Sequence, residues 1–273
     1  MLNLIKMDLH RLFHTKSFKV GLLLSAAASF IFIALIAGLL AILQEMLKNP
    51  ESAEAVVFFP AAGWLVNGTS VGEIILTGFG AFSLLVSTIL TAIFINSEQS
   101  SGYIKNIAGQ VSNKGYMIVS KLFTIAVINL AIFAVFSVFS AVSGFVFLSY
   151  VIKSVSFLPF IPVLLIKFLL YMAIDAIILF ICTLTKSKSF AVAVGVIFGI
   201  GITGFVYSAL NSLITFITNG TDVKLATFTP DGINSILSIN ADAGLLIKAV
   251  VISVVYIAVF TIASSLVFKK RDV

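Results

Sequence analysis

Residues 20–43 read VGLLLSAAASFIFIALIAGLLAIL, a run without a single charged side chain. About 20 consecutive apolar residues are enough to cross the hydrocarbon core of a bilayer as a helix. The apolar region of a secretory signal sequence is shorter, about 7–15 residues. We therefore interpret this run as a retained first membrane span and expect an integral membrane protein.

The composition of the whole chain supports this reading. The 273 residues are 60% hydrophobic and 10% charged, with a mean hydropathy of +1.18. Soluble domains carry about 25% charged and about 45–50% apolar residues, so a soluble fold could not cover this much apolar surface. The net charge of +6 is explained by basic cytoplasmic loops, and we expect no nucleic-acid partner.

Apolar runs recur along the chain and predict an all-α, polytopic protein with six transmembrane helices. Residues 1–18 form a separate element, and residues 19–273 form one six-helix transmembrane domain. The longest runs, the third and the fifth, exceed the length that one crossing needs, so they are expected to tilt, kink or end in interfacial turns. The predicted spans are approximately 20–43, 73–96, 119–148, 159–184, 189–218 and 245–268.

The distribution of basic residues predicts the orientation. With the N-terminus inside, most of the 17 lysines and arginines fall in cytoplasmic segments, as the positive-inside rule requires. Six spans then also place the basic tail Lys269, Lys270 and Arg271 inside. We predict a multi-pass protein of the plasma membrane with both termini in the cytoplasm.

The first 18 residues have the pattern of an amphipathic helix. Leu2, Ile5, Leu9 and Leu12 recur at three- and four-residue spacing, which places them on one helical face. Such a helix can lie in the inner membrane interface before the chain enters the bilayer. The alternative is a basic flank that only sets the topology.

Motifs for catalysis are missing from the sequence. A P-loop requires Gly-x-x-x-x-Gly-Lys-Ser/Thr, whereas Lys114 precedes Gly115 at the nearest match. The two histidines, His10 and His14, lie outside the predicted spans, and Cys182 is the single cysteine. We therefore expect no enzyme and no cofactor on this chain, and any ATP that drives it must be bound by another subunit.

The longest predicted cytoplasmic loop reads NSEQSSGYIKNIAGQVSNKGYMIVSK over residues 96–121. Gly102 permits a turn after Glu98, and residues 103–108 could form a short polar helix. A short helix in such a loop can contact a soluble partner. From the residues alone, a solvated loop that only sets topology is equally compatible.

This loop and the opening residues MLNLIKMDLHRLFHTKSF resemble permease subunits of type 2 ATP-binding-cassette (ABC) exporters, in particular small bacterial members. The resemblance implies a coupling helix that contacts the ATPase subunit, and a second permease subunit, identical or related. It implies ATP and magnesium on the partner, a bacterial plasma membrane, and a hydrophobic or amphipathic cargo such as an antimicrobial peptide or a lipid-like compound. The residues it places at the ATPase contact are Glu98, Gly102, Tyr103, Lys105 and Asn106.

Two other functions remain open at this point. The chain could be a membrane binding or immunity protein without transport, or a self-contained secondary transporter. Secondary transporters typically have inverted repeats, broken helices or several buried ionisable groups. The sequence has one acidic residue deep in a predicted span and no convincing repeat, which favours the exporter.

Three polar residues lie within predicted spans: Asn129, Lys167 and Asp175. A charge near the bilayer centre costs about 2.5–3.5 kcal/mol on insertion scales. Lys167 is nearer the outer end, from where its long side chain can reach the interface. Asn129 and Asp175 have similar depths, so they are expected to meet across helices or line a wet cavity. A purely structural hydrogen bond or a protonated carboxyl is the alternative.

Small residues recur every four positions in the fifth predicted span, at Ala191, Gly195 and Gly199. Such a stripe allows another helix to approach closely. It is consistent with a seam between two copies or with packing inside one subunit. Further on, residues 230–232 read PDG and indicate a turn.

Overall fold

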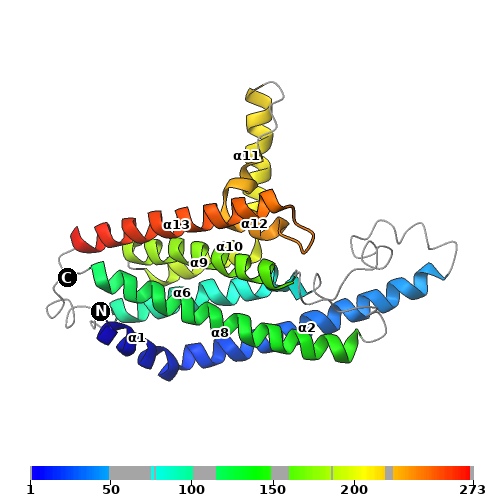
Figure 1. Ribbon diagram of the computed structural model, residues 1–273, viewed down its shortest axis with the longest axis horizontal. Helices are drawn as coiled ribbons and strands as arrows, with labels where there is room; N and C mark the ends of the chain where they lie inside the picture. The colour runs from blue at the N-terminus through cyan, green and yellow to red at the C-terminus, as the bar shows by residue number, and fades with distance from the viewer. Residues whose placement is uncertain are drawn as a thin grey trace.

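A computed structural model describes residues 2–48, 75–76, 78–100, 115–148, 160–185, 187–218 and 224–270. Secondary structure within these ranges is entirely helical, which confirms the all-α prediction for this part of the chain. Figure 1 shows most of the helices running along one direction as a bundle. The elements are α1 (Leu2–His14), α2 (Lys16–Leu47), the π-helical η1 (Phe79–Ser83), α6 (Leu84–Ser100), α8 (Gly115–Phe147), α9 (Phe160–Thr185), α10 (Lys188–Ile200), α11 (Thr203–Ile217), the 3-10 helix η2 (Leu225–Phe228), α12 (Pro230–Ile236) and α13 (Ala243–Lys270).

Four of the described helices, α2, α8, α9 and α13, are long and apolar enough to cross a membrane. They also expose apolar side chains on the outside of the bundle, among them Leu23 at 69%, Leu165 at 61% and Val251 at 55%. Water would solvate such a surface poorly, whereas lipid solvates it directly. This part of the prediction, a membrane-embedded helical protein, agrees with the structure.

The fifth predicted span, 189–218, is not one continuous helix, in agreement with the expectation that this long run tilts, kinks or ends in an interfacial turn. α10 ends at Ile200, and α11 continues at an angle of 73° to it. Gly201 adopts the left-handed conformation with φ of 77°. Its N–H donates to Phe198 O, and the N–H of Ile202 donates to Ile197 O, both at 3.2 Å. This is the Schellman pattern, which ends a helix because the chain turns away from the axis.

In the second predicted span, 73–96, residues 75–76 and 78 are helical, the π-helical turn η1 follows, and the helix continues as α6. A π turn disturbs the normal i to i−4 hydrogen bonding. The hydroxyl of Tyr171 on α9 donates to the carbonyl oxygen of Phe79 in this turn. Ser83 Oγ lies 2.8 Å from the same hydroxyl. α9 therefore stabilises the irregular start of this helix.

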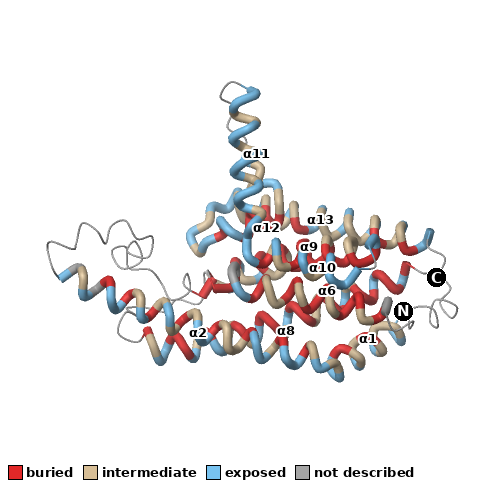
Figure 2. Tube along the Cα trace, turned by 180° about the vertical axis from the view of Figure 1, so that it is seen from behind, coloured by how far each residue is buried: buried red, intermediate tan, exposed pale blue. Residues whose placement is uncertain are grey.

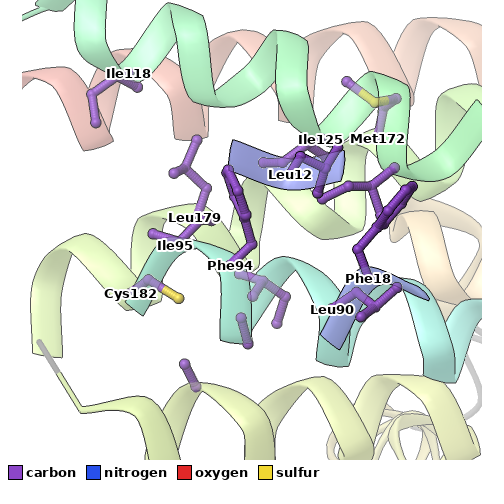
Figure 3. Packing of buried hydrophobic residues seen from close by; sticks show 14 of the residues in the cluster. Leu12, Phe18, Leu90, Phe94, Ile95, Ile118, Ile125, Met172, Leu179 and Cys182 are labelled. Atoms are coloured by element: carbon purple, nitrogen blue, oxygen red, sulfur yellow. The ribbon is translucent and has the colours of Figure 1, made fainter. Parts of the chain in front are cut away.

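α9 is the central helix, and more than half of the residues in its most apolar stretch are buried. It packs against α13, α6, α10 and α8, while α2 packs against α8 and α10 packs against α6. Figure 2 shows the contrast between the buried α9 and the exposed α11, which has no buried residue. The side chains labelled in Figure 3 join Leu12 of α1 and Phe18 of α2 to Leu90 and Phe94 of α6.

Contacts between α6 and its neighbours define the helix directions. Ser87 of α6 contacts Asn129 of α8, and Glu98 contacts Lys121. The partner number falls as the α6 number rises, so α6 and α8 are antiparallel. Figure 1 shows α1 and the last turns of α13 at the same end of the bundle. The chain therefore enters and leaves the bundle on one side.

Candidate functional site

Four charged side chains meet where α1 packs against α6 and α8. We call Asp8, Arg11, Glu98 and Lys121 the charge cluster. Lys121 Nζ lies 3.0 Å and 3.1 Å from the two oxygens of Asp8, and it also pairs with Glu98. Arg11 forms a second ion pair with Glu98. Ser120 Oγ donates to Asp8 Oδ2 at 2.6 Å.

Three members of the charge cluster are buried despite their polarity, while Arg11 is partly exposed. Asp8, Glu98 and Lys121 are 3%, 1% and 7% exposed. The Arg11 guanidinium also lies over the Phe94 ring, 4.8 Å from its centroid. Two acids and two bases balance within the cluster, which is the condition for holding charges away from water.

The charge cluster lies close to the residues predicted to contact the ATPase subunit. α6 ends at Ser100 and α8 begins at Gly115, so the cluster lies near the two helix ends that border residues 101–114. Of the five residues predicted at that contact, the structure describes Glu98 and places it in the cluster. The other four, Gly102, Tyr103, Lys105 and Asn106, lie outside the described residues.

A second polar group lies in the middle of the bundle, between α6, α8 and α9. The structure brings Asn129 and Asp175 together, because Asn129 Nδ2 donates to Asp175 Oδ2 at 2.8 Å. Ser87 Oγ donates to the same oxygen at 2.6 Å and also contacts Asn129 Oδ1. All three side chains are fully buried. Ser87 was not predicted as part of this group, although its depth in the second predicted span is similar to that of Asn129 and Asp175.

We expect Asp175→Asn to fold with a free energy of unfolding within about 1 kcal/mol of the original, because the amide oxygen can still accept both hydrogen bonds. Thermal unfolding of the purified protein in detergent would measure this. A loss of several kcal/mol would contradict the expectation and would show that the negative charge itself holds the three helices together. Normal folding with altered transport would assign a functional role to the charge.

The small residues Ala191, Gly195 and Gly199 are all buried on the side of α10 that faces α6. Thr88 Oγ1 donates to Gly195 O at 2.9 Å. A Cβ on Gly195 would lie 3.2 Å from Thr88 Cβ, so the helices touch at this point. Of the two interpretations of the stripe, the structure shows packing inside one chain.

Sequence position suggested that the Lys167 side chain could reach the outer interface, but in the structure it does not. It is 2% exposed, and α12 covers it. Its ammonium group donates to the backbone oxygen of Asn234 at 3.1 Å and to Asn234 Oδ1 at 3.3 Å. Within the described ranges, no three His, Cys, Asp or Glu side chains are grouped in a way that could hold a metal ion.

Comparison with known protein families and with characterised proteins gives no match for this chain. The resemblance to exporter permeases therefore depends on the residues and the layout described above.

Proposed function

We propose that this chain is the membrane-spanning permease subunit of an ABC exporter, and that a separate subunit hydrolyses ATP with magnesium. The observation that carries the proposal is the charge cluster. It fixes α1 to the ends of α6 and α8, which border residues 101–114. A partner that pushes on this end of the molecule would move three helices together, which is the mechanical property that a coupling surface needs.

The proposed topology has six crossings, with the second formed by η1 and α6 and the fifth formed by α10. An even number of crossings agrees with the position of α1 and the end of α13 on one side of the bundle. Basic side chains gather at this end, and acidic ones precede α13 at the other, which favours a cytoplasmic location for α1. α1 exposes Leu2 at 74% and Phe13 at 50%, so it is suited to the inner interface.

The working unit would contain two permeases, identical or related, and two ATPases. ATP binding by the partner can shift the permease pair between two states only through contacts that differ between those states. Residues 101–106 are the proposed place of these contacts, and the charge cluster would transmit them to α1, α6 and α8. The cargo would be hydrophobic or amphipathic, in agreement with the few charges inside the bundle.

Copurification tests this proposal. The chain would be expressed in its own host from its native locus, and the ABC ATPase activity that copurifies with it in detergent would be measured. We expect Glu98→Gln to reduce the amount of bound ATPase or its stimulation by the permease. The matched control is Glu45→Gln, because Glu45 is exposed and pairs with Lys48 far from the cluster. Solute movement by the purified chain alone along an ion gradient would contradict the proposal.

A further inference from the structure

We propose that a cavity between α9, α10, α11 and α12 binds the zwitterionic headgroup of a phospholipid, with the anionic group at Lys167 and the ammonium group at Asp231. The binding site stands on the contacts of this chain alone. As a statement about cargo it rests on the proposed function, which it extends by naming a chemical class.

The cavity has a volume of about 490 Å³, within the range of about 300–1,000 Å³ that is usual for small-molecule sites. It exists because α11 turns away from the axis of α10 at Gly201, as Figure 1 shows. α12 then returns toward α9 and packs against it. Residues from both sides of the bend line the cavity, so the broken helix is what creates the space.

Lys167 contributes an uncompensated positive charge to the cavity lining. Its two hydrogen bonds to Asn234 leave one of the three ammonium N–H groups available. Asn234 is neutral, and no carboxylate of the described residues lies within ion-pair distance of Lys167. A buried charge without a counterion is costly, and an anionic ligand group in the cavity would offset that cost.

Asp231 contributes the opposite charge to the same lining and is 7% exposed. The Tyr207 hydroxyl lies 2.9 Å from each of its carboxylate oxygens. A neutral hydroxyl satisfies part of the hydrogen-bonding capacity but carries no charge. Among the residues that the structure describes, no cation lies within ion-pair distance of Asp231. Lys167 and Asp231 therefore share one cavity without pairing with each other. A ligand that carries both an anionic group and an ammonium group satisfies both.

The surroundings of the cavity favour a lipid over a small polar zwitterion. Leu76, Phe198 and Ile200 supply apolar parts of the lining. Ile200 is 62% exposed, and Phe205 in the first turns of α11 is 80% exposed. An acyl chain that leaves the cavity would therefore lie along apolar surface, and lipids surround a membrane-embedded chain at high concentration.

Native mass spectrometry of the purified chain in neutral detergent tests the inference, with short-chain phosphatidylethanolamine as the zwitterionic probe and short-chain phosphatidylglycerol as the anionic probe. We expect the original protein to prefer phosphatidylethanolamine. Lys167→Met should weaken binding of both lipids about tenfold, because it removes a charge-assisted hydrogen bond. Asp231→Asn should remove the preference between the two lipids, because it removes the negative charge that pairs with the lipid ammonium group. The local structure should persist, because the amide oxygen can still accept from the Tyr207 hydroxyl.

The matched control is Lys248→Met, which removes one positive charge outside the cavity lining. Lys248 donates to Thr227 at 3.0 Å and lies over the Phe228 ring. Gly204→Phe is a second variant that keeps Lys167: Gly204 lines the cavity, and a Cβ there would meet no atom within 4 Å. We expect it to weaken binding by occupying the space.

Equal binding of both lipids by the original protein would overturn the inference. Unchanged binding by Lys167→Met and Gly204→Phe would also overturn it, as would tighter binding of a zwitterionic apolar dipeptide. Lipid binding that follows the expected pattern without any copurifying ATPase would support the binding site and contradict only the exporter proposal. A copurifying ATPase together with equal binding of the two lipids would support the exporter proposal and contradict the binding site.

Discussion

Lys121→Met is expected to lower the free energy of unfolding by about 3–5 kcal/mol, because it removes the cation that bridges two buried acids. Lys121 contacts Asp8 on α1 and Glu98 on α6. Without Lys121, Asp8 still accepts a hydrogen bond from the Ser120 hydroxyl, but α8 no longer supplies a positive charge to balance it. We expect α1 to detach from the bundle, and limited proteolysis within residues 2–14 to accelerate before the other helices unfold.

The control for this prediction is Lys19→Met, since Lys19 is exposed near the start of α2. Its loss should change the stability by less than about 0.5 kcal/mol. The double variant Asp8→Asn with Lys121→Met is expected to lose less stability than the sum of the two single losses, because the residues are in direct contact. Additive losses would contradict the bridging role of Lys121.

Gly199→Val is expected to lower the free energy of unfolding by about 3 kcal/mol, at the upper end of the usual cost of overpacking. A Cβ at this position would lie 2.5 Å from Leu85 Cα and 2.8 Å from Leu85 Cβ. A backbone atom cannot move aside as a flexible side chain can. α10 would have to separate from α6, and the hydrogen bond from Thr88 to Gly195 would lengthen. Thermal unfolding in detergent measures the loss.

Gly38→Val is the matched control, because a Cβ at Gly38 in α2 would meet no atom within 4 Å. Both glycines are helical, so the change in intrinsic helix propensity is similar in the two variants. We expect Gly38→Val to keep nearly the original unfolding temperature. Equal losses in both variants would show that the close contact between α10 and α6 contributes little.

Hydropathy predicted the long helices well, because each crossing imposes the same requirement on a continuous stretch of sequence. The apolar runs at 20–43, 159–184 and 245–268 correspond to α2, α9 and α13, with ends that differ by a few residues. The length of the fifth run predicted a tilt, a kink or an interfacial turn, but it did not place the break after Ile200, because glycine is common inside membrane helices. Only the conformation of Gly201 distinguishes a helix end from a tolerated glycine.

Local patterns also left the partners of polar residues undetermined. Depth along the helices indicated that Asn129 and Asp175 could meet, and they do. The pairing of Asp8 with Lys121 joins residues far apart in the sequence, and no local spacing indicates such a contact. Residues 230–232 indicated a turn but instead begin α12, in agreement with the preference of proline for the first position of a helix.

The shortness of α10 has a consequence for the bilayer around the protein. Thirteen residues make a helix about 20 Å long, whereas the hydrocarbon core is about 30 Å thick. Phe190 and Ile200, near its two ends, are both exposed. In the proposed topology, where α10 forms the fifth crossing, the bilayer beside it must become thinner to avoid hydrophobic mismatch. The annular lipids along α10 would then differ in order from those along α2 and α8.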